Sequence, residues 1–149
     1  MDRKVPMPRA DDEITTLARQ WIGFTRRRHP ETGDLARTPA FSLPAGVDAP
    51  VRILSDLLLS DPLYMTEVLS AVWSLSDDEW VLACLGGGPL EDLLWLGDTD
   101  VNALIEMEAA THPNARMALA NVWVERLPPV SARLVRRVLG PSKVVQFKP

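Results

Sequence analysis

Adjacent acidic residues are the side chains of this sequence with the clearest capacity for chemistry. The acid pairs are Asp77-Asp78, Glu91-Asp92 and Glu106/Glu108. Paired carboxylates can support general acid–base catalysis or bind magnesium. Most of these acids, however, fall where we expect a helix to begin, and acidic side chains favour that position because the helix dipole is positive there. Helix capping therefore explains the pairs without catalysis.

The other residue types with reactive side chains give no catalytic pattern. His29 and His112 lack a second ligand at a recognisable metal-binding spacing. Cys84 is the single cysteine and has apolar neighbours, so we expect a buried, inert thiol and no intrachain disulfide. The glycines at 86–88 lack the lysine of a phosphate-binding P-loop and are followed by two acids. We therefore expect neither an enzyme, nor a metal site, nor a cofactor.

Charge is distributed very unevenly along the chain, although the net charge is only −4. Residues 53–115 contain twelve acids and no Lys or Arg, whereas residues 116–149 contain seven cations and the single acid Glu125. Residues 53–115 are called the acidic segment below. The acidic segment has no local cations for helical ion pairs, so it either pairs with the flanking segments or presents negative potential to solvent.

The composition is that of one folded domain. A chain of 149 residues with 46% hydrophobic residues can bury a substantial core. No apolar run is long enough to span a bilayer and the N-terminus lacks a secretory signal pattern, so we expect a cytoplasmic protein that does not bind membranes. Arginine clusters at 26–28 and 133–137 lie at expected helix ends, and the acidic net charge disfavours direct nucleic-acid binding.

Breaker residues divide the chain into five parts. We predict a flexible arm over residues 1–10, a first helix over 12–29, a proline-rich linker over 30–50, a helical core over 51–139 and a tail over 140–149, all within a single domain of residues 1–149. Phe41 and Leu43 are expected to anchor the linker to the core. A linker of this length is also a secondary candidate for partner contact.

The helical core is predicted from helix-start and helix-stop residues. Asp61 is expected to cap a helix that opens with Pro62, Ser76 to open a capping box with Glu79, and the Gly97–Asp100 stretch to offer another cap. We interpret the three glycines before Pro89 as a corner between two packed helices.

Together these signals predict an all-α protein with seven or eight short helices, either an irregular bundle or a short α-solenoid of stacked helical hairpins. The face of the helix that follows Pro113 is expected to carry Met117, Ala120 and Trp123. Four tryptophans fall on apolar faces and are expected in the core, whereas Trp95 is expected to be partly exposed. The four are Trp21, Trp73, Trp80 and Trp123.

The sequence Gly88-Pro89-Leu90-Glu91-Asp92-Leu93-Leu94, followed by Ile105-Glu106 and Val122-Trp123, resembles a family of small, uncharacterised bacterial proteins with a Gly-Pro-Leu-Glu-Asp-Leu-Leu signature. The resemblance covers residues 60–125 and implies a helical bacterial protein. It implies no activity, so it assigns no functional residue. The proline-rich front part lies outside it.

These observations predict a non-enzymatic protein-binding module, specifically an immunity protein or inhibitor that covers a basic surface of a partner protein such as a toxin or effector. The predicted partner-binding residues are Asp77, Asp78, Glu79, Glu91, Asp92, Asp98, Asp100 and Trp95. The alternative is a structural or adaptor protein whose acidic segment pairs with the cationic C-terminal helix.

Overall fold

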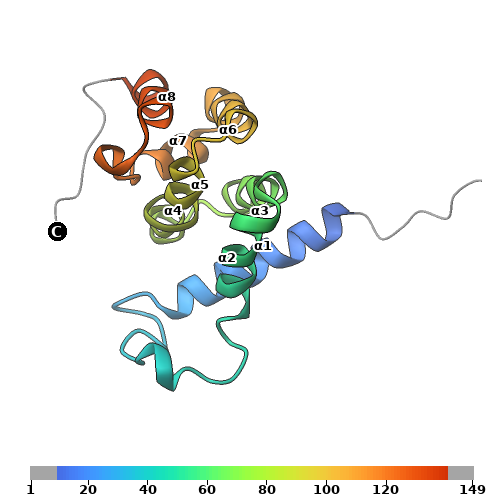
Figure 1. Cartoon of the computed structure of the whole chain (residues 1–149). Coiled ribbons are helices and arrows are strands. Elements are labelled where there is room, and N and C mark those ends of the chain that lie inside the picture. The colour runs from blue at the N-terminus through green and yellow to red at the C-terminus, as the bar shows by residue number, and fades with distance from the viewer. Residues whose placement is uncertain (1–9, 141–149) are drawn as a thin grey trace, which may run out of the picture.

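The computed structural model describes residues 10–140, which form eight α-helices and no strand (Figure 1). The helices are α1 (Ala10–Arg27), α2 (Ala49–Ser60), α3 (Pro62–Leu75), α4 (Glu79–Leu85), α5 (Glu91–Trp95), α6 (Thr99–Thr111), α7 (Pro113–Leu119) and α8 (Pro129–Leu139). Short 3₁₀ turns lie at Ala40–Ser42 and Val124–Arg126, and a π-helical turn, Gly86–Leu90, joins α4 to α5. The all-α prediction is confirmed. Nearly all of the predicted arm and tail lies outside the described residues.

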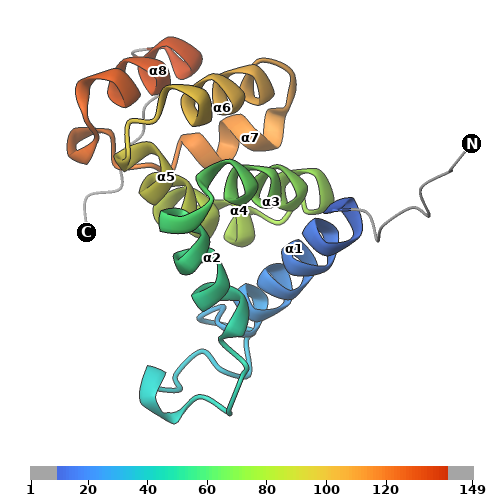
Figure 2. The same cartoon turned by 45° about the vertical axis from the view of Figure 1, so that its right-hand side comes forward.

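Helix α3 is the centre of the structure. It packs against α1 and α2 on one side and against α6 and α7 on the other, as Figure 2 shows. Its side chains Val68, Leu69, Val72 and Trp73 are completely buried. A solenoid repeat would contact only its neighbours in the stack, whereas α3 contacts helices from both ends of the chain. The architecture is therefore an irregular bundle.

Aspartate side chains cap the N-termini of three of these helices. Asp61 accepts a hydrogen bond from the Tyr64 amide at 3.1 Å, and Asp98 accepts from the Asp100 amide at 2.9 Å, as the sequence predicted. The predicted capping box at Ser76 is wrong, because the cap of α4 is Asp78. Ser76 instead ends α3 and accepts from the Asp78 amide at 3.2 Å. Serine and aspartate are about equally good caps, so the choice of Asp78 is set by where α4 begins and not by the residue type.

The glycine-rich stretch does not form the predicted corner. Gly86 has ordinary helical angles, φ −66° and ψ −46°, and the chain continues from α4 through the π turn into α5. A wider turn accommodates Pro89, which lacks an amide hydrogen and whose ring would crowd the preceding turn of an α-helix. Gly86 is required by packing, because a Cβ there would lie 1.9 Å from the Ala118 carbonyl oxygen of α7.

Residues 28–48 connect α1 to α2 and correspond to the predicted linker. The prediction that Phe41 anchors this segment is wrong, since the Phe41 side chain is 91% exposed. Leu35 is the buried residue of the segment, and Leu43 is only half-buried. Near its start the segment is fixed by the Arg28 guanidinium, which donates to the carbonyl oxygens of Leu35 and Thr38 at 2.7 and 2.6 Å.

The two C-terminal helices each bury one face against the core. In α8, Leu134 and Leu139 point inward and the arginines point outward. The face predicted for α7 is wrong, because the helix ends at Leu119 and buries Ala115, Ala118 and Leu119. Of the tryptophans, Trp21 and Trp73 are buried, Trp80 and Trp123 are half-buried, and Trp95 is exposed.

Candidate protein-binding surface

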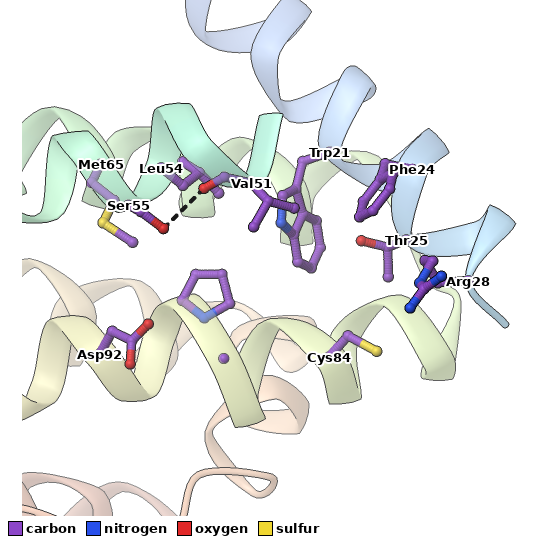
Figure 3. Close-up of a pocket in the computed structure, with 12 residues that line it drawn as sticks. Trp21, Phe24, Thr25, Arg28, Val51, Leu54, Ser55, Met65, Cys84 and Asp92 are labelled. Atoms are coloured by element: carbon purple, nitrogen blue, oxygen red, sulfur yellow. Dashed lines mark hydrogen bonds between the residues drawn. The ribbon is translucent and has the colours of Figure 1, made fainter. Parts of the chain in front are cut away.

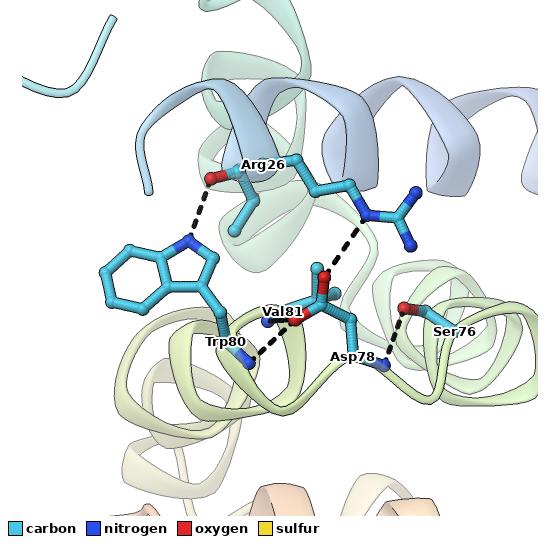
Figure 4. Close-up of polar contacts among 6 residues, drawn as sticks. Arg26, Ser76, Asp78, Trp80 and Val81 are labelled. Atoms are coloured by element: carbon cyan, nitrogen blue, oxygen red, sulfur yellow. Dashed lines mark hydrogen bonds and ion pairs between the residues drawn. The ribbon is translucent and has the colours of Figure 1, made fainter. Parts of the chain in front are cut away.

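The structure places the eight predicted binding residues on several elements, and four of the acids have structural roles. Asp78 caps α4 by accepting from the Trp80 and Val81 amides at 2.9 and 3.4 Å (Figure 4). It also pairs with Arg26 of α1, with 3.4 Å between Nε and Oδ2. Asp98 is the cap of α6. These two carboxylates begin helices and are not available as a continuous binding face.

Two further acids hold distant parts of the chain together. The Asn114 side-chain amide donates to Asp77 at 2.8 Å, which joins the α3–α4 turn to α7. The backbone amide of Trp123 donates to Glu91 Oε1 at 2.6 Å. Glu91 is thereby directed toward the segment after α7, whereas its neighbour Asp92 points to another side of α5. This divergence follows from the roughly 100° that separates consecutive residues of a helix.

The remaining three acids are free of structural contacts. Glu79 and Asp100 are exposed, and Asp92 is exposed to solvent on one side but partly buried on the other. None of the three forms a hydrogen bond or ion pair with the described part of the chain through its carboxylate. They lie on α4, α5 and α6 respectively. Substitutions of these three acids can therefore be tested for their effect on partner binding, with little effect on the fold.

The acidic segment as a whole remains largely without cationic partners. Among residues 10–140, two of its twelve acids form ion pairs, Asp78 with Arg26 and Glu106 with Arg137. Arg133 and Arg136 of α8 form no ion pair with a described acid. Most of the negative charge of the segment thus faces solvent or neutral partners.

A groove next to Asp92 is the best-formed apolar cavity near the predicted residues. It has a volume of about 300 Å³ and lies between α2 and the continuous α4–π–α5 segment, with α1 closing one end (Figure 3). We call it the α2–α5 groove. Its lining residues are Trp21, Phe24, Thr25, Arg28, Val51, Leu54, Ser55, Met65, Cys84, Gly88, Pro89 and Asp92.

Burial perturbs two titratable groups of the α2–α5 groove, Asp92 and Cys84. Partial burial raises the pKa of the Asp92 carboxyl above its usual value. Burial, and secondarily the charge of Asp78, raises the pKa of the Cys84 thiol to about 11. Cys84 is therefore a neutral thiol at physiological pH and a poor nucleophile, in agreement with the inert role predicted for it.

Trp95 lies one turn beyond Asp92 on α5 and is 63% exposed. Residues three and four apart share a helix face, so Pro89, Asp92, Trp95 and Leu96 follow one another along the same side of the π turn and α5. This side combines a carboxylate, an indole and the wall of an apolar groove. It is the part of the predicted site where several binding features meet.

The arrangement closest to a catalytic pair lies between α3 and α6. Ser74 Oγ is 3.4 Å from His112 Nε2, but it is also placed to donate to the Ser70 carbonyl oxygen at 2.8 Å. His112 Nδ1 is buried and has no hydrogen-bond partner among the described residues, so no third group orients the imidazole. Neighbouring Ser70 donates to Glu108. Ser74 and His112 therefore lack the third, orienting group that activates the serine of a catalytic triad.

Residues 10–140 contain neither a metal-binding cluster nor a membrane-spanning helix. No group of three or more His, Cys, Asp or Glu side chains is placed to hold a metal ion there. Among the helices of this part of the chain, none has both the length and the apolar character needed to cross a bilayer.

Comparison with known proteins identifies the chain's family. Residues 53–139, more than half of the chain, match a family of unknown function, DUF6869, and the chain belongs to this family. The predicted membership in an uncharacterised family is confirmed, and the match extends beyond the predicted 60–125. No curated protein and no solved structure matches the chain. The match includes the groove wall formed by the π turn and α5 but excludes α1 and the segment 28–48.

Sequence reasoning missed the exposed Phe41 and the groove beside Asp92. The signal for Phe41 is the uncharged run 38–47, which is rich in proline and contains a single aromatic residue. The groove has no comparable signal, because its walls come from α1, α2, α3 and α4–α5. The placement of Asp92 in the wall follows only from tertiary packing.

Proposed function

We propose that this protein is a non-enzymatic protein-binding module, an immunity protein or inhibitor that covers a basic surface of a partner in the bacterial cytoplasm. The observation that supports this proposal is the acidic segment, in which ten of twelve acids lack an ion pair with any described residue. Unpaired carboxylates on a stable helical frame give a negative potential that speeds encounter with a basic partner and disfavours acidic ones.

Affinity needs apolar anchors as well as charge, because exposed ion pairs contribute little. Trp95 and Phe41 are the two exposed aromatic side chains best suited to this role, at 63% and 91% exposure. Trp95 lies beside the uncontacted Asp92, which places an anchor next to a charge. Phe41 belongs to the 3₁₀ turn Ala40–Ser42 of the segment between α1 and α2, and Figure 2 shows this part of the segment well away from α5.

A structural or adaptor protein with internally paired charges is the second candidate. The ion pair between Glu106 of α6 and Arg137 of α8 favours it, since this pair joins the acidic segment to the cationic C-terminal helix. It is the single ion pair of this kind among the described residues. Arg126 contacts the ring of Trp123 instead of an acidic-segment carboxylate, with 3.9 Å from Cζ to the ring centroid.

The proposal is tested by neutralising acids that have no structural contact. A variant with Glu79→Gln, Asp92→Asn and Asp100→Asn, called the triple variant below, should fold normally. Tagged wild-type protein and triple variant are used to capture partners from the native host, with quantitative mass spectrometry. We expect a basic protein that the triple variant retains about tenfold less, because each exposed charge contributes a fraction of a kcal/mol.

The matched control is Arg133→Gln with Arg136→Gln, which removes two exposed cations of α8 that have no ion pair with a described acid. This control should retain the partner at least as well as the wild type. Equal capture by the wild type and the triple variant, or capture of no specific protein, would contradict the proposed function.

A further inference from the structure

The α2–α5 groove is built from apolar walls around one carboxylate. Trp21, Leu54 and Met65 are buried beneath it, and Pro89 extends the apolar lining along the α4–α5 side. Figure 3 shows Asp92 on the α5 wall, opposite Ser55 of α2. An elongated side chain with an apolar stem would bury that stem here, and its end group would meet Asp92.

Asp92 has no partner to stabilise its charge in the wall. Its carboxylate forms no hydrogen bond or ion pair with the described residues, and partial burial raises its pKa. A carboxylate that loses water without gaining a partner is destabilised. A cation placed in the groove would supply the missing partner, so the site favours a positively charged occupant.

Trp95 adds a second feature that favours a cation. It lies three residues after Asp92 on α5 and exposes most of its indole ring. Because residues three apart share a helix face, a guanidinium or ammonium group bound at Asp92 would lie on the side of α5 that carries the Trp95 indole, and indole faces attract cations. Arginine and lysine side chains combine such a head group with an aliphatic stem.

Arg28, at the α1 end of the groove, does not make the site suitable for an anion. Its Nη1 already donates to the Leu35 and Thr38 carbonyl oxygens, so this part of the guanidinium holds the 28–48 segment. A neutral apolar occupant would bury Asp92 further without a partner. The π turn that forms part of the wall is itself a type of irregularity found often at functional sites.

We propose that the α2–α5 groove binds an arginine or lysine side chain of the protein partner, with the stem against Trp21, Leu54 and Pro89 and the cation between Asp92 and Trp95. This inference rests on the proposed function, because it specifies how a basic partner is recognised. It makes Asp92 different from the other acids, which act through long-range attraction.

The test is an NMR titration of the uniformly ¹⁵N-labelled full chain with Nα-acetyl-arginine amide, and with Nα-acetyl-norleucine amide as the neutral probe. We expect chemical-shift changes concentrated in the amides of residues 51–55 and 88–96. The arginine probe should cause them at lower concentrations than the norleucine probe. Asp92→Asn should weaken the affinity for the arginine probe about tenfold, which corresponds to about 1.4 kcal/mol of binding free energy. Asp12→Asn, which changes an exposed acid of α1 outside the acidic segment, should leave its affinity unchanged.

A second variant blocks the groove and leaves its charge intact. Ser55 lies exposed at the rim and its hydroxyl bonds only to the Val51 carbonyl oxygen of its own helix. Ser55→Trp should therefore fill the opening without affecting the core and abolish the localised shifts. Equal effects of Asp92→Asn and Asp12→Asn, or arginine-probe shifts spread over all acidic residues, would overturn the groove proposal.

A deca-arginine peptide separates this inference from the proposed function. Suppose that deca-arginine binds the wild type but not the triple variant, and that Nα-acetyl-arginine amide does not bind at the groove. The proposed function is then supported, and the groove inference is wrong. If deca-arginine fails to bind the wild type, the proposed function loses its support. The single-residue probe still decides whether the groove accepts a cation.

Discussion

At the scale of single residues, neighbouring acids of this chain have different tasks. Glu91 accepts the Trp123 backbone amide, whereas Asp92 lies in the wall of the α2–α5 groove with no described partner. Asp78 begins α4 and pairs with Arg26. A carboxylate that satisfies a backbone amide contributes to stability, whereas one that is partly buried without a partner lowers it.

Asp92→Asn should increase the free energy of unfolding by a few tenths of a kcal/mol at neutral pH, the usual scale for exposed sites. The raised pKa means that the folded state binds a proton more tightly than the unfolded chain, so ionised Asp92 costs stability above its folded pKa. The gain should shrink as the pH falls through that pKa toward the ordinary aspartate value of about 3.9.

Urea denaturation of both proteins at several pH values checks this prediction. Cys84, which also lines the groove, stays neutral across the acidic range because burial raises the pKa of its thiol to about 11, so it does not imitate the effect. A stability gain that is the same at all pH values, or a loss at neutral pH, would show that Asp92 is not destabilised by desolvation.

The sequence predicted residue roles where the contact is local. The cap Asp61 was predicted, and the Gly97–Asp100 stretch was predicted to contain the cap that is now seen at Asp98, because the partner amides lie two or three residues away. The partners of Asp77 and Glu91 lie 37 and 32 residues away, and nothing in the local pattern indicates them. Asp92 was predicted as a binding residue, but its groove could not be, because helices from distant parts of the chain have to meet to form it.

At the scale of elements, packing decides what the glycine-rich stretch does. Glycine and proline are the strongest local breakers, which is why the sequence predicts a corner there. The structure instead keeps this stretch helical and uses Gly86 for close approach to α7. The error arises because a chain-breaking glycine and a close-packing glycine look the same in a single sequence.

Gly86→Ala should destabilise the protein by more than about 2 kcal/mol, since the new methyl group would overlap the Ala118 carbonyl and force α4 and α7 apart. Gly23→Ala is the matched control, because a methyl group at this exposed position of α1 would have no other atom within 4 Å. Gly23→Ala should stabilise the protein by about 0.5–1 kcal/mol, because alanine has a higher helix propensity than glycine. Thermal unfolding measures both, and similar effects of the two changes would contradict the packing argument.

The segment between α1 and α2 offers a second comparison within one element. Leu35→Ala should cost about 2 kcal/mol, the lower end for buried leucines, because Leu35 is the buried anchor of the segment. Phe41→Ala should change stability by less than about 0.5 kcal/mol, because the ring is exposed. Chemical denaturation distinguishes them. A larger loss for Phe41→Ala would restore the sequence-based expectation that Phe41 is the anchor.

At the scale of the whole molecule, the all-α class was predictable because helix caps, prolines and apolar spacing are frequent and local. The irregular bundle was not separable from a solenoid, since that choice depends on which distant helices contact α3. The charge segregation was fully visible in the sequence. Whether its charges pair internally depended on the fold, in which most of the acidic segment lacks cationic partners among the described residues.

The central claim is that this unpaired negative charge attracts a basic partner protein. Its most direct test is the association rate constant of the captured partner, measured by stopped-flow fluorescence as a function of salt concentration. We expect the wild-type rate constant to fall at least about tenfold from low to high ionic strength, and the triple variant to show a lower rate and a shallower dependence. Identical rate constants and salt dependence for the two proteins would contradict the claim.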